Sequence, residues 1–156
     1  MKKQKGFSLI ELLIVVAIIL IIAAIAIPNL IKSKMAANEA SAVGSVRTIN
    51  TGEVNYAASC PATGFSTNLA GLFSGGGCLG GQGIIDQVLS GGAKSGYTFT
   101  EAGVTGTDGL NDTYTTIALP ATVGTTGQRA FYSDQTGVIR YTLTGAAPTN
   151  ASNALQ

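Results

Sequence analysis

A run of apolar residues near the N-terminus constrains this chain more than any other feature. The sixteen residues from Leu12 to Ile27 are all apolar, and a single acid, Glu11, stands directly before them. Residues 12–31 would form about 30 Å of helix, which is enough to cross the hydrocarbon core of a bilayer. The sequence therefore predicts one membrane span over about residues 12–31.

Basic residues flank this predicted span on both sides. Three lysines lie within residues 1–6, and Lys32 and Lys34 follow the span. Because cytoplasmic flanks carry an excess of basic residues, the pattern modestly favours a cytoplasmic N-terminus. After residue 6, six basic residues stand against eight acidic ones. This balance argues against a general nucleic-acid surface, although it leaves nucleic acid open as a partner.

Glu11 is unusual at the edge of such a run. A carboxylate at the centre of a bilayer costs roughly 2.5–3.5 kcal/mol, and a position near one end lowers this cost without removing it. A secretory signal peptide, with Ala24-Ile25-Ala26 as its cleavage site, leaves Glu11 unexplained, and so does a plain membrane anchor. An acid within a membrane is by default a functional residue with a partner. Cleavage of the chain before the apolar run is therefore favoured over both a signal peptide and a plain anchor.

The residues around Glu11 also carry a family resemblance. Lys5-Gly6-Phe7-Ser8-Leu9-Ile10-Glu11-Leu12 resembles the prepilin peptidase site of type IV pilins and related pseudopilins, and the apolar run continues this pattern to Pro28. The resemblance implies that Gly6 precedes the cleaved bond and that Phe7 becomes an N-methylated N-terminus. It also implies that Glu11 is the assembly acid and that Pro28 lies where filament helices loosen or kink. Ser8 stands where the family often has threonine, a departure that we take as neutral.

Apolar periodicity extends the predicted helix beyond the membrane span. Between residues 35 and 56, apolar residues recur every three, four or seven positions, which predicts an amphipathic helix with one packing stripe: Met35, Ala42, Val46, Ile49 and Tyr56. We predict a cleaved leader over residues 1–6, one helix of roughly 75 Å over residues 7–57, and a globular domain over residues 58–156.

After Gly96 the apolar period changes to two, which is typical of strands. Four alternating segments predict an antiparallel sheet: Tyr97–Thr100, Thr113–Leu119, Ala130–Ser133 and Val138–Leu143. Asp134-Gln135-Thr136-Gly137 fits a type I turn with a glycine bulge between the last two strands. The predicted fold class is therefore α+β, with a long N-terminal helix packed on a roughly four-stranded antiparallel sheet. The resemblance to pilins implies the same fold.

The two cysteines, Cys60 and Cys78, lie in the segment between the helix and the sheet. Cysteines on an exported domain usually pair, whereas those of a cytosolic chain are more often free thiols. Because a membrane span precedes them, we predict a Cys60–Cys78 disulfide.

The rest of that segment, residues 58–95, is rich in glycine and serine and is predicted to be irregular, with one short helix around residues 84–89. Gly75-x-Gly77-x-x-Gly80 formally fits a dinucleotide fingerprint, but no strand precedes it, so a flexible loop is the better interpretation. The tail, residues 145–156, is predicted to be mobile.

Few residues of this chain support catalysis. The sequence contains no histidine, which removes the Cys-His and Ser-His-Asp nucleophile systems. We therefore expect neither an enzyme nor a cofactor. Asp108 and Asp112 are weak candidates for a calcium site, because calcium favours several oxygen ligands. Their spacing is not that of an EF-hand, and a solvated turn is the favoured interpretation.

The function implied by the resemblance is that of a type IV pilin. Such a protein is a single-pass precursor in the cytoplasmic membrane that prepilin peptidase cuts. An assembly platform and its motor then polymerise the mature helix into a helical homopolymer at the cell surface. A pseudopilin of a type II secretion system is the first alternative, because the two cysteines close the loop after the helix rather than the C-terminal loop usual in pilins. A membrane-anchored binding module, which would tolerate Glu11→Ala, is the second.

Overall fold

The computed structural model describes residues 7–75 and 78–155. The predicted leader, residues 1–6, lies outside the described residues. The chain divides into two compact units, Met1–Lys34 and Met35–Gln156, and each is described by itself.

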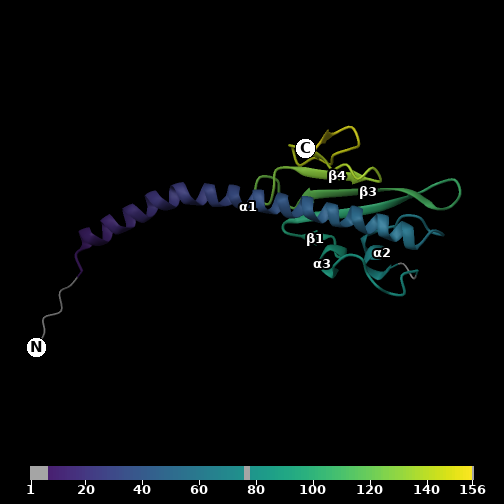
Figure 1. Cartoon of the computed structure of the whole chain (residues 1–156). Coiled ribbons are helices and arrows are strands. Elements are labelled where there is room, and N and C mark those ends of the chain that lie inside the picture. Colours follow the sequence, from purple (N-terminus) through teal and green to yellow (C-terminus); the bar gives the residue numbers. More distant parts are fainter. Residues whose placement is uncertain (1–6, 76–77, 156) are drawn as a thin grey trace, which may run out of the picture. The chain divides into compact units, whose positions relative to one another are not determined.

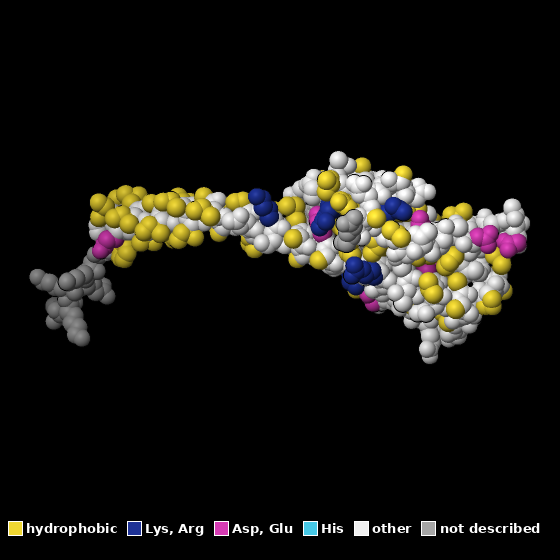
Figure 2. All heavy atoms as spheres, turned by 45° about the horizontal axis from the view of Figure 1, so that its top comes forward, with side chains coloured by type: hydrophobic (Ala, Val, Ile, Leu, Met, Phe, Trp, Pro, Cys, Tyr) yellow, Lys and Arg dark blue, Asp and Glu magenta, His cyan; other side chains and the backbone are white. Residues whose placement is uncertain are grey.

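One long helix, α1 (Leu9–Ser59), contributes residues to both units (Figure 1). It begins and ends two residues later than the predicted range of residues 7–57. The large apolar side chains of residues 9–31 are 42–75% exposed, and hydrophobic side chains cover the visible face of this part of α1 (Figure 2). By length and composition α1 is able to cross a membrane.

Six antiparallel strands form a meander in which each strand pairs with the next one along the chain. They are β1 (Ala93–Lys94), β2 (Tyr97–Thr105), β3 (Asn111–Pro120), β4 (Ala130–Asp134), β5 (Arg140–Thr142) and β6 (Asn153–Ala154). The four predicted strands correspond to β2–β5, whereas the two-residue strands β1 and β6 were not predicted. The α+β fold is confirmed, with six strands where roughly four were expected.

The second half of α1 packs on this sheet through the predicted stripe. Ala42, Val46 and Ile49 are fully buried, and Tyr56 is 4% exposed. They form one core with residues from the strands, among them Tyr97, Phe99, Ala118 and Phe131. Full burial of one large apolar side chain contributes about 1.5–3 kcal/mol. Hydrophobic burial therefore fixes which face of this half of α1 lies on the sheet.

The segment between α1 and the sheet is more ordered than its composition predicts. It contains α2 (Leu69–Ser74), which was missed, and α3 (Gln87–Ser90), which overlaps the predicted short helix. The side chains of Asn68 and Asp86 cap the two helices by accepting a backbone N–H from the first turn. Leu72 and Leu89 anchor the helices in the core, where both are fully buried.

The tail of the chain also differs from its prediction. Residues 145–156 were expected to be mobile, but β6 pairs with β5, and the Leu155 N–H donates to the Ile139 carbonyl at 2.7 Å. The Leu155 side chain packs against the core. The predicted turn before β5 is present, because the Gly137 N–H donates to the Asp134 carbonyl at 2.9 Å and Gly137 has a positive φ of 71°.

Candidate processing and assembly site

The acid in front of the apolar run lies in the first turn of α1. The Glu11 Oε2 accepts the backbone N–H of Ser8 at 2.9 Å, and the Leu12 N–H donates to the Ser8 carbonyl at 3.3 Å. Ser8 thus precedes the helix in the manner of an N-cap, and Glu11 reaches back to it, which is one half of a capping box. The helix dipole favours a negative charge at this end. The spacing Ser8-x-x-Glu11 carries this signal in the sequence, where it was missed.

The cap gives Glu11 a partner within its own chain. A carboxylate accepts up to about four hydrogen bonds, and one backbone N–H satisfies only part of that capacity. Glu11 is exposed in the described structure, so its remaining oxygen is open to a further cation or donor. Phe7, two residues before the helix, is 76% exposed. Gly6, the other predicted processing residue, lies outside the described residues.

Pro28 lies inside α1 and does not end it. Proline lacks the N–H that would bond to the carbonyl four residues earlier, and its ring crowds that carbonyl. The helix therefore has a built-in weak point within the predicted span. This location is compatible with the role that the resemblance implies, which stays a prediction.

The predicted disulfide is present and joins the end of α1 to the loop after α2. Cys60 follows the last residue of α1 and is 2% exposed. It is bonded to Cys78, and their Cα atoms are 5.7 Å apart across a sequence separation of 18. The bridge closes the glycine-rich loop against the core. A helix, α2, precedes Gly75 where a dinucleotide fingerprint requires a strand, so the spacing of these glycines does not indicate a nucleotide site.

The two calcium candidates lie in the β2–β3 hairpin, Asp108 in the turn and Asp112 near the start of β3. Asp108 and Asp112 both approach Gly106, so closely that a β-carbon there would collide with the Asp112 carboxylate. The Asp108 Oδ1 already accepts the Leu110 N–H at 3.0 Å. Within residues 7–75 and 78–155, no group of three or more acidic or cysteine residues gathers as a metal site would require. Because calcium takes six to eight oxygen ligands, we propose no calcium site here.

Among the described residues four acids are buried: Asp134, in the predicted turn, and three that the sequence analysis missed, Glu39 and Glu53 on α1 and Glu101 on β2. Glu39 joins α1 to the start of β4, where it accepts the backbone N–H groups of Gln128 and Arg129 and the Arg129 Nε at 2.7–3.0 Å. Burial opposes its ionisation, but these bonds and the nearby guanidinium outweigh that effect and lower the pKa of Glu39. The contribution of Glu39 to stability is therefore present near neutral pH and is lost as the pH falls.

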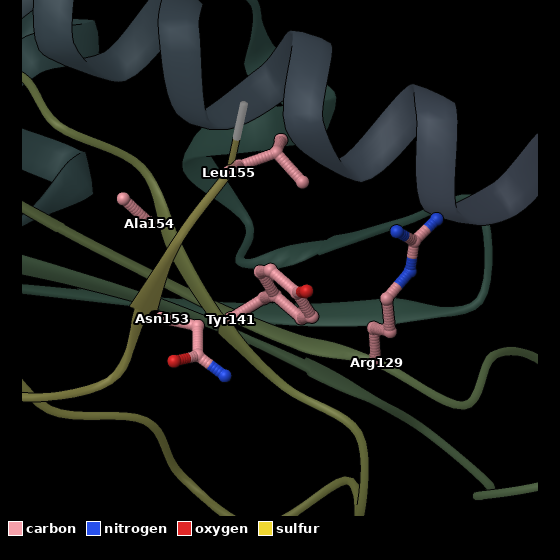
Figure 3. A pocket seen from close by; sticks show the side chains of 5 residues that line it. All are labelled: Arg129, Tyr141, Asn153, Ala154 and Leu155. Carbon is pink, nitrogen blue, oxygen red and sulfur yellow. The ribbon is translucent and has the colours of Figure 1, made fainter.

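Arg129 also lines a cavity of about 520 Å³ with Tyr141, Asn153, Ala154 and Leu155 (Figure 3). Its guanidinium carbon lies 5.8 Å from the centre of the Tyr141 ring. The described residues that line this cavity include one cation, Arg129, and one phenol, Tyr141.

The comparisons with known proteins bear on the N-terminal segment. Residues 1–27 match the prokaryotic N-terminal methylation motif. The chain is 59% identical over 39 residues to the type IV wide pilus major component PilA4 of Thermus thermophilus, a match that covers 25% of this chain and 30% of that protein. It is 44% identical over 54 residues to the type IV major pilin protein PilA of Myxococcus xanthus, which covers 35% of this chain and 24% of that protein.

These matches confirm the resemblance to type IV pilins. The chain aligns with less than a third of the length of either relative. No solved structure matches the chain.

Proposed function

We propose that this chain is the structural subunit of a type IV pilus, made as a membrane precursor, cut after Gly6 and polymerised through α1. The observation that carries the proposal is the methylation motif over residues 1–27. Two further features support it: the large apolar side chains of residues 9–31 of α1 are exposed, and the two relatives are named as pilus components. The role is structural rather than enzymatic.

Processing divides the chain into two parts. Residues 1–6 are the leader that prepilin peptidase removes, and the mature chain from Phe7 onward consists of α1, which ends at Ser59, and the domain that α1 carries. The precursor spans the cytoplasmic membrane once with its N-terminus in the cytoplasm, which agrees with the lysines of the leader. The assembly platform and motor then draw the helix from lipid into the filament.

Cleavage after Gly6 creates a positively charged amine, which can serve as a partner for Glu11 that the precursor lacks. The new amine of Phe7 is positively charged, and methylation of that amine keeps the charge. The carboxylate of a resident Glu11 has one N–H donor in its own chain, from Ser8. The amine of an incoming subunit supplies a charged donor to it, and charge-assisted hydrogen bonds in a low-dielectric environment are roughly twice as strong as neutral ones. Pairing of amine and carboxylate thus sets the axial register of assembly.

Close packing of the helices replaces the contacts that they lose with lipid. Association of apolar helices depends on small residues that allow close approach. Ala17, Ala23, Ala24 and Ala26 supply such surfaces within the apolar run. Pro28 lets the helix loosen at one point as the subunits pack.

The pseudopilin alternative is favoured by one observation, the position of the disulfide. Cys60–Cys78 closes the loop directly after α1, whereas the resemblance to pilins leads one to expect a bridged C-terminal loop. Pilins and pseudopilins share processing and assembly of the helix, so the two proposals differ only in the product. One forms long surface fibres and the other a short periplasmic piston.

Deletion of the gene in the source organism separates these functions. We expect surface fibres to disappear, to return when the wild-type chain is supplied, and to contain this chain when they are sheared off and digested for mass spectrometry. Loss of exoprotein secretion with intact fibres would contradict the pilus proposal and support the pseudopilin. Intact fibres with normal secretion would contradict both.

A further inference from the structure

Two glutamates meet inside the second unit, where α1 packs on the sheet. Glu53 on α1 is 0% exposed and Glu101 on β2 is 8% exposed. Glu53 accepts the Ser66 N–H, and the next residue, Thr67, accepts the N–H of Gly103 on β2 at 3.4 Å, so one short segment links Glu53 to the part of β2 that carries Glu101. The other inward positions of β2 are Tyr97 and Phe99. Glu101 therefore occupies a place that an apolar core residue would be expected to take.

Most of the buried oxygen atoms around this pair have no hydrogen-bond partner in the described structure. The Glu53 Oε2 accepts the Ser66 N–H at 2.9 Å. The Glu53 Oε1 and both carboxyl oxygens of Glu101 have no partner in the described structure. Thr116 stands directly opposite Glu101 in the β2–β3 ladder, is 0% exposed, and its hydroxyl is also without a partner. Four buried oxygen atoms thus share one region of the helix–sheet interface.

No cation within the described residues compensates these acids. The ion pairs of that part of the chain join Lys94 to Asp86 and Arg129 to Glu39, so neither reaches Glu53 or Glu101. Burying an unpaired carboxylate costs several kcal/mol, and two adjacent carboxylates also repel each other. A proton on one of them removes both penalties, because it cancels a charge and supplies an O–H donor to the other.

We propose that Glu53 and Glu101 hold a proton between them, and that loss of this proton in alkaline solution loosens α1 from β2. Burial raises the pKa of both carboxyl groups, and the neighbouring Glu53 charge raises the pKa of Glu101 further. The folded chain therefore binds the proton more tightly than the unfolded chain does. It follows that the free energy of unfolding decreases as the pH rises above about 4.5, the ordinary carboxyl value.

The other titratable groups facing the pair do not supply this effect. Tyr114 on β3 is 1% exposed and donates its hydroxyl to the Asn50 Oδ1 at 3.1 Å. Burial first, and then the acids around it, raise the pKa of Tyr114, so it stays neutral over this range. Asp134 at the end of β4 accepts the Thr136 N–H at 2.9 Å. The segment that carries Ser66 and α2 presents no acid or base between residues 61 and 75.

The test is thermal unfolding of the full-length chain in detergent at pH values from 5 to 9, for the wild type and Glu101→Gln. Glutamine keeps the shape and supplies a permanent donor to Glu53. We expect the Tm of the wild type to fall by roughly 5–10 °C across this range, and that of Glu101→Gln to fall by less than half as much. Asp112→Asn, an exposed acid on the neighbouring strand, is the control and should follow the wild type. Equal slopes for the wild type and Glu101→Gln would overturn the proposal.

Two further measurements keep the proposal falsifiable if Glu101→Gln does not fold. The infrared spectrum of the wild type at pH 7 should contain the band of a protonated carboxylic acid, which disappears by pH 10. Absence of that band at pH 7 would overturn the proposal. So would a rise in the wild-type Tm at pH 7 on adding calcium, reversed by a chelator, because the pair would then hold a cation where the proposal has a proton.

Discussion

We expect Glu11→Ala to leave cleavage after Gly6 largely intact but to impair polymerisation into filaments. In the proposed function the peptidase acts before the apolar run, whereas the carboxylate is needed afterwards, when the amine of an incoming Phe7 requires a partner. The variant loses this charge together with the bond that Glu11 accepts from Ser8 at 2.9 Å. The measurement is an immunoblot for the processed chain in membranes beside a count of sheared surface fibres. Normal fibres from Glu11→Ala would refute the register role.

Glu11→Gln separates the negative charge of Glu11 from its hydrogen bond to Ser8, both of which Glu11→Ala removes. Its side-chain carbonyl still accepts the Ser8 N–H, so the cap of α1 is kept, but the negative charge is lost. Loss of a cap alone costs about 0.5–2 kcal/mol of helix stability, which a long hydrophobic helix tolerates. We expect Glu11→Gln to fail in assembly as Glu11→Ala does. Assembly of Glu11→Gln with failure of Glu11→Ala would show that the cap, and not the charge, is what the filament requires.

Cys60→Ser combined with Cys78→Ser lowers the free energy of unfolding of the second unit by about 3 kcal/mol. The bridge spans 18 residues, so most of its contribution comes from restricting the unfolded chain. Cys60 is also 2% exposed, and a serine there adds the cost of burying a hydroxyl. Urea unfolding of the full-length chain in detergent, followed by the near-UV circular dichroism of its tyrosines, measures the change.

The wild-type chain with its disulfide reduced is the matched control for this variant. It lacks the bridge but keeps both sulfur atoms, so the difference between the two samples isolates the serine substitution. We expect the reduced wild type to account for most of the loss. A reduced wild type as stable as the oxidised chain would show that the bridge contributes nothing to the fold.

Much of the fold was predictable because its signals are local. The stripe of Ala42, Val46 and Ile49 follows the helix period, and the alternation from Tyr97 onward follows the strand period. The helix α2 was missed because glycine and serine surround it in the sequence. The burial of Leu69 and Leu72 in the core stabilises this short helix, and that burial depends on tertiary contacts. The short strands β1 and β6 depend on neighbours that local periodicity does not identify.

The candidate site was predictable to a smaller extent. The motif around Gly6 and Phe7 is contiguous and recognisable, and so was the spacing of Ser8 and Glu11 that signals the cap. Glu53 and Glu101 are different, because each looks like an ordinary polar residue until the helix and the sheet bring them together. Continuing the alternation of Tyr97 and Phe99 by one step would have placed Glu101 inward.

The mass of the mature N-terminal peptide shows directly whether the chain is cleaved after Gly6 and methylated at Phe7. Chain isolated from membranes or from sheared fibres is digested, and its first peptide is identified by mass spectrometry. We expect a peptide that starts at Phe7 and carries one methyl group on its amine. A chain that keeps Met1, or one that starts at Ile27 after cleavage by signal peptidase, would contradict it.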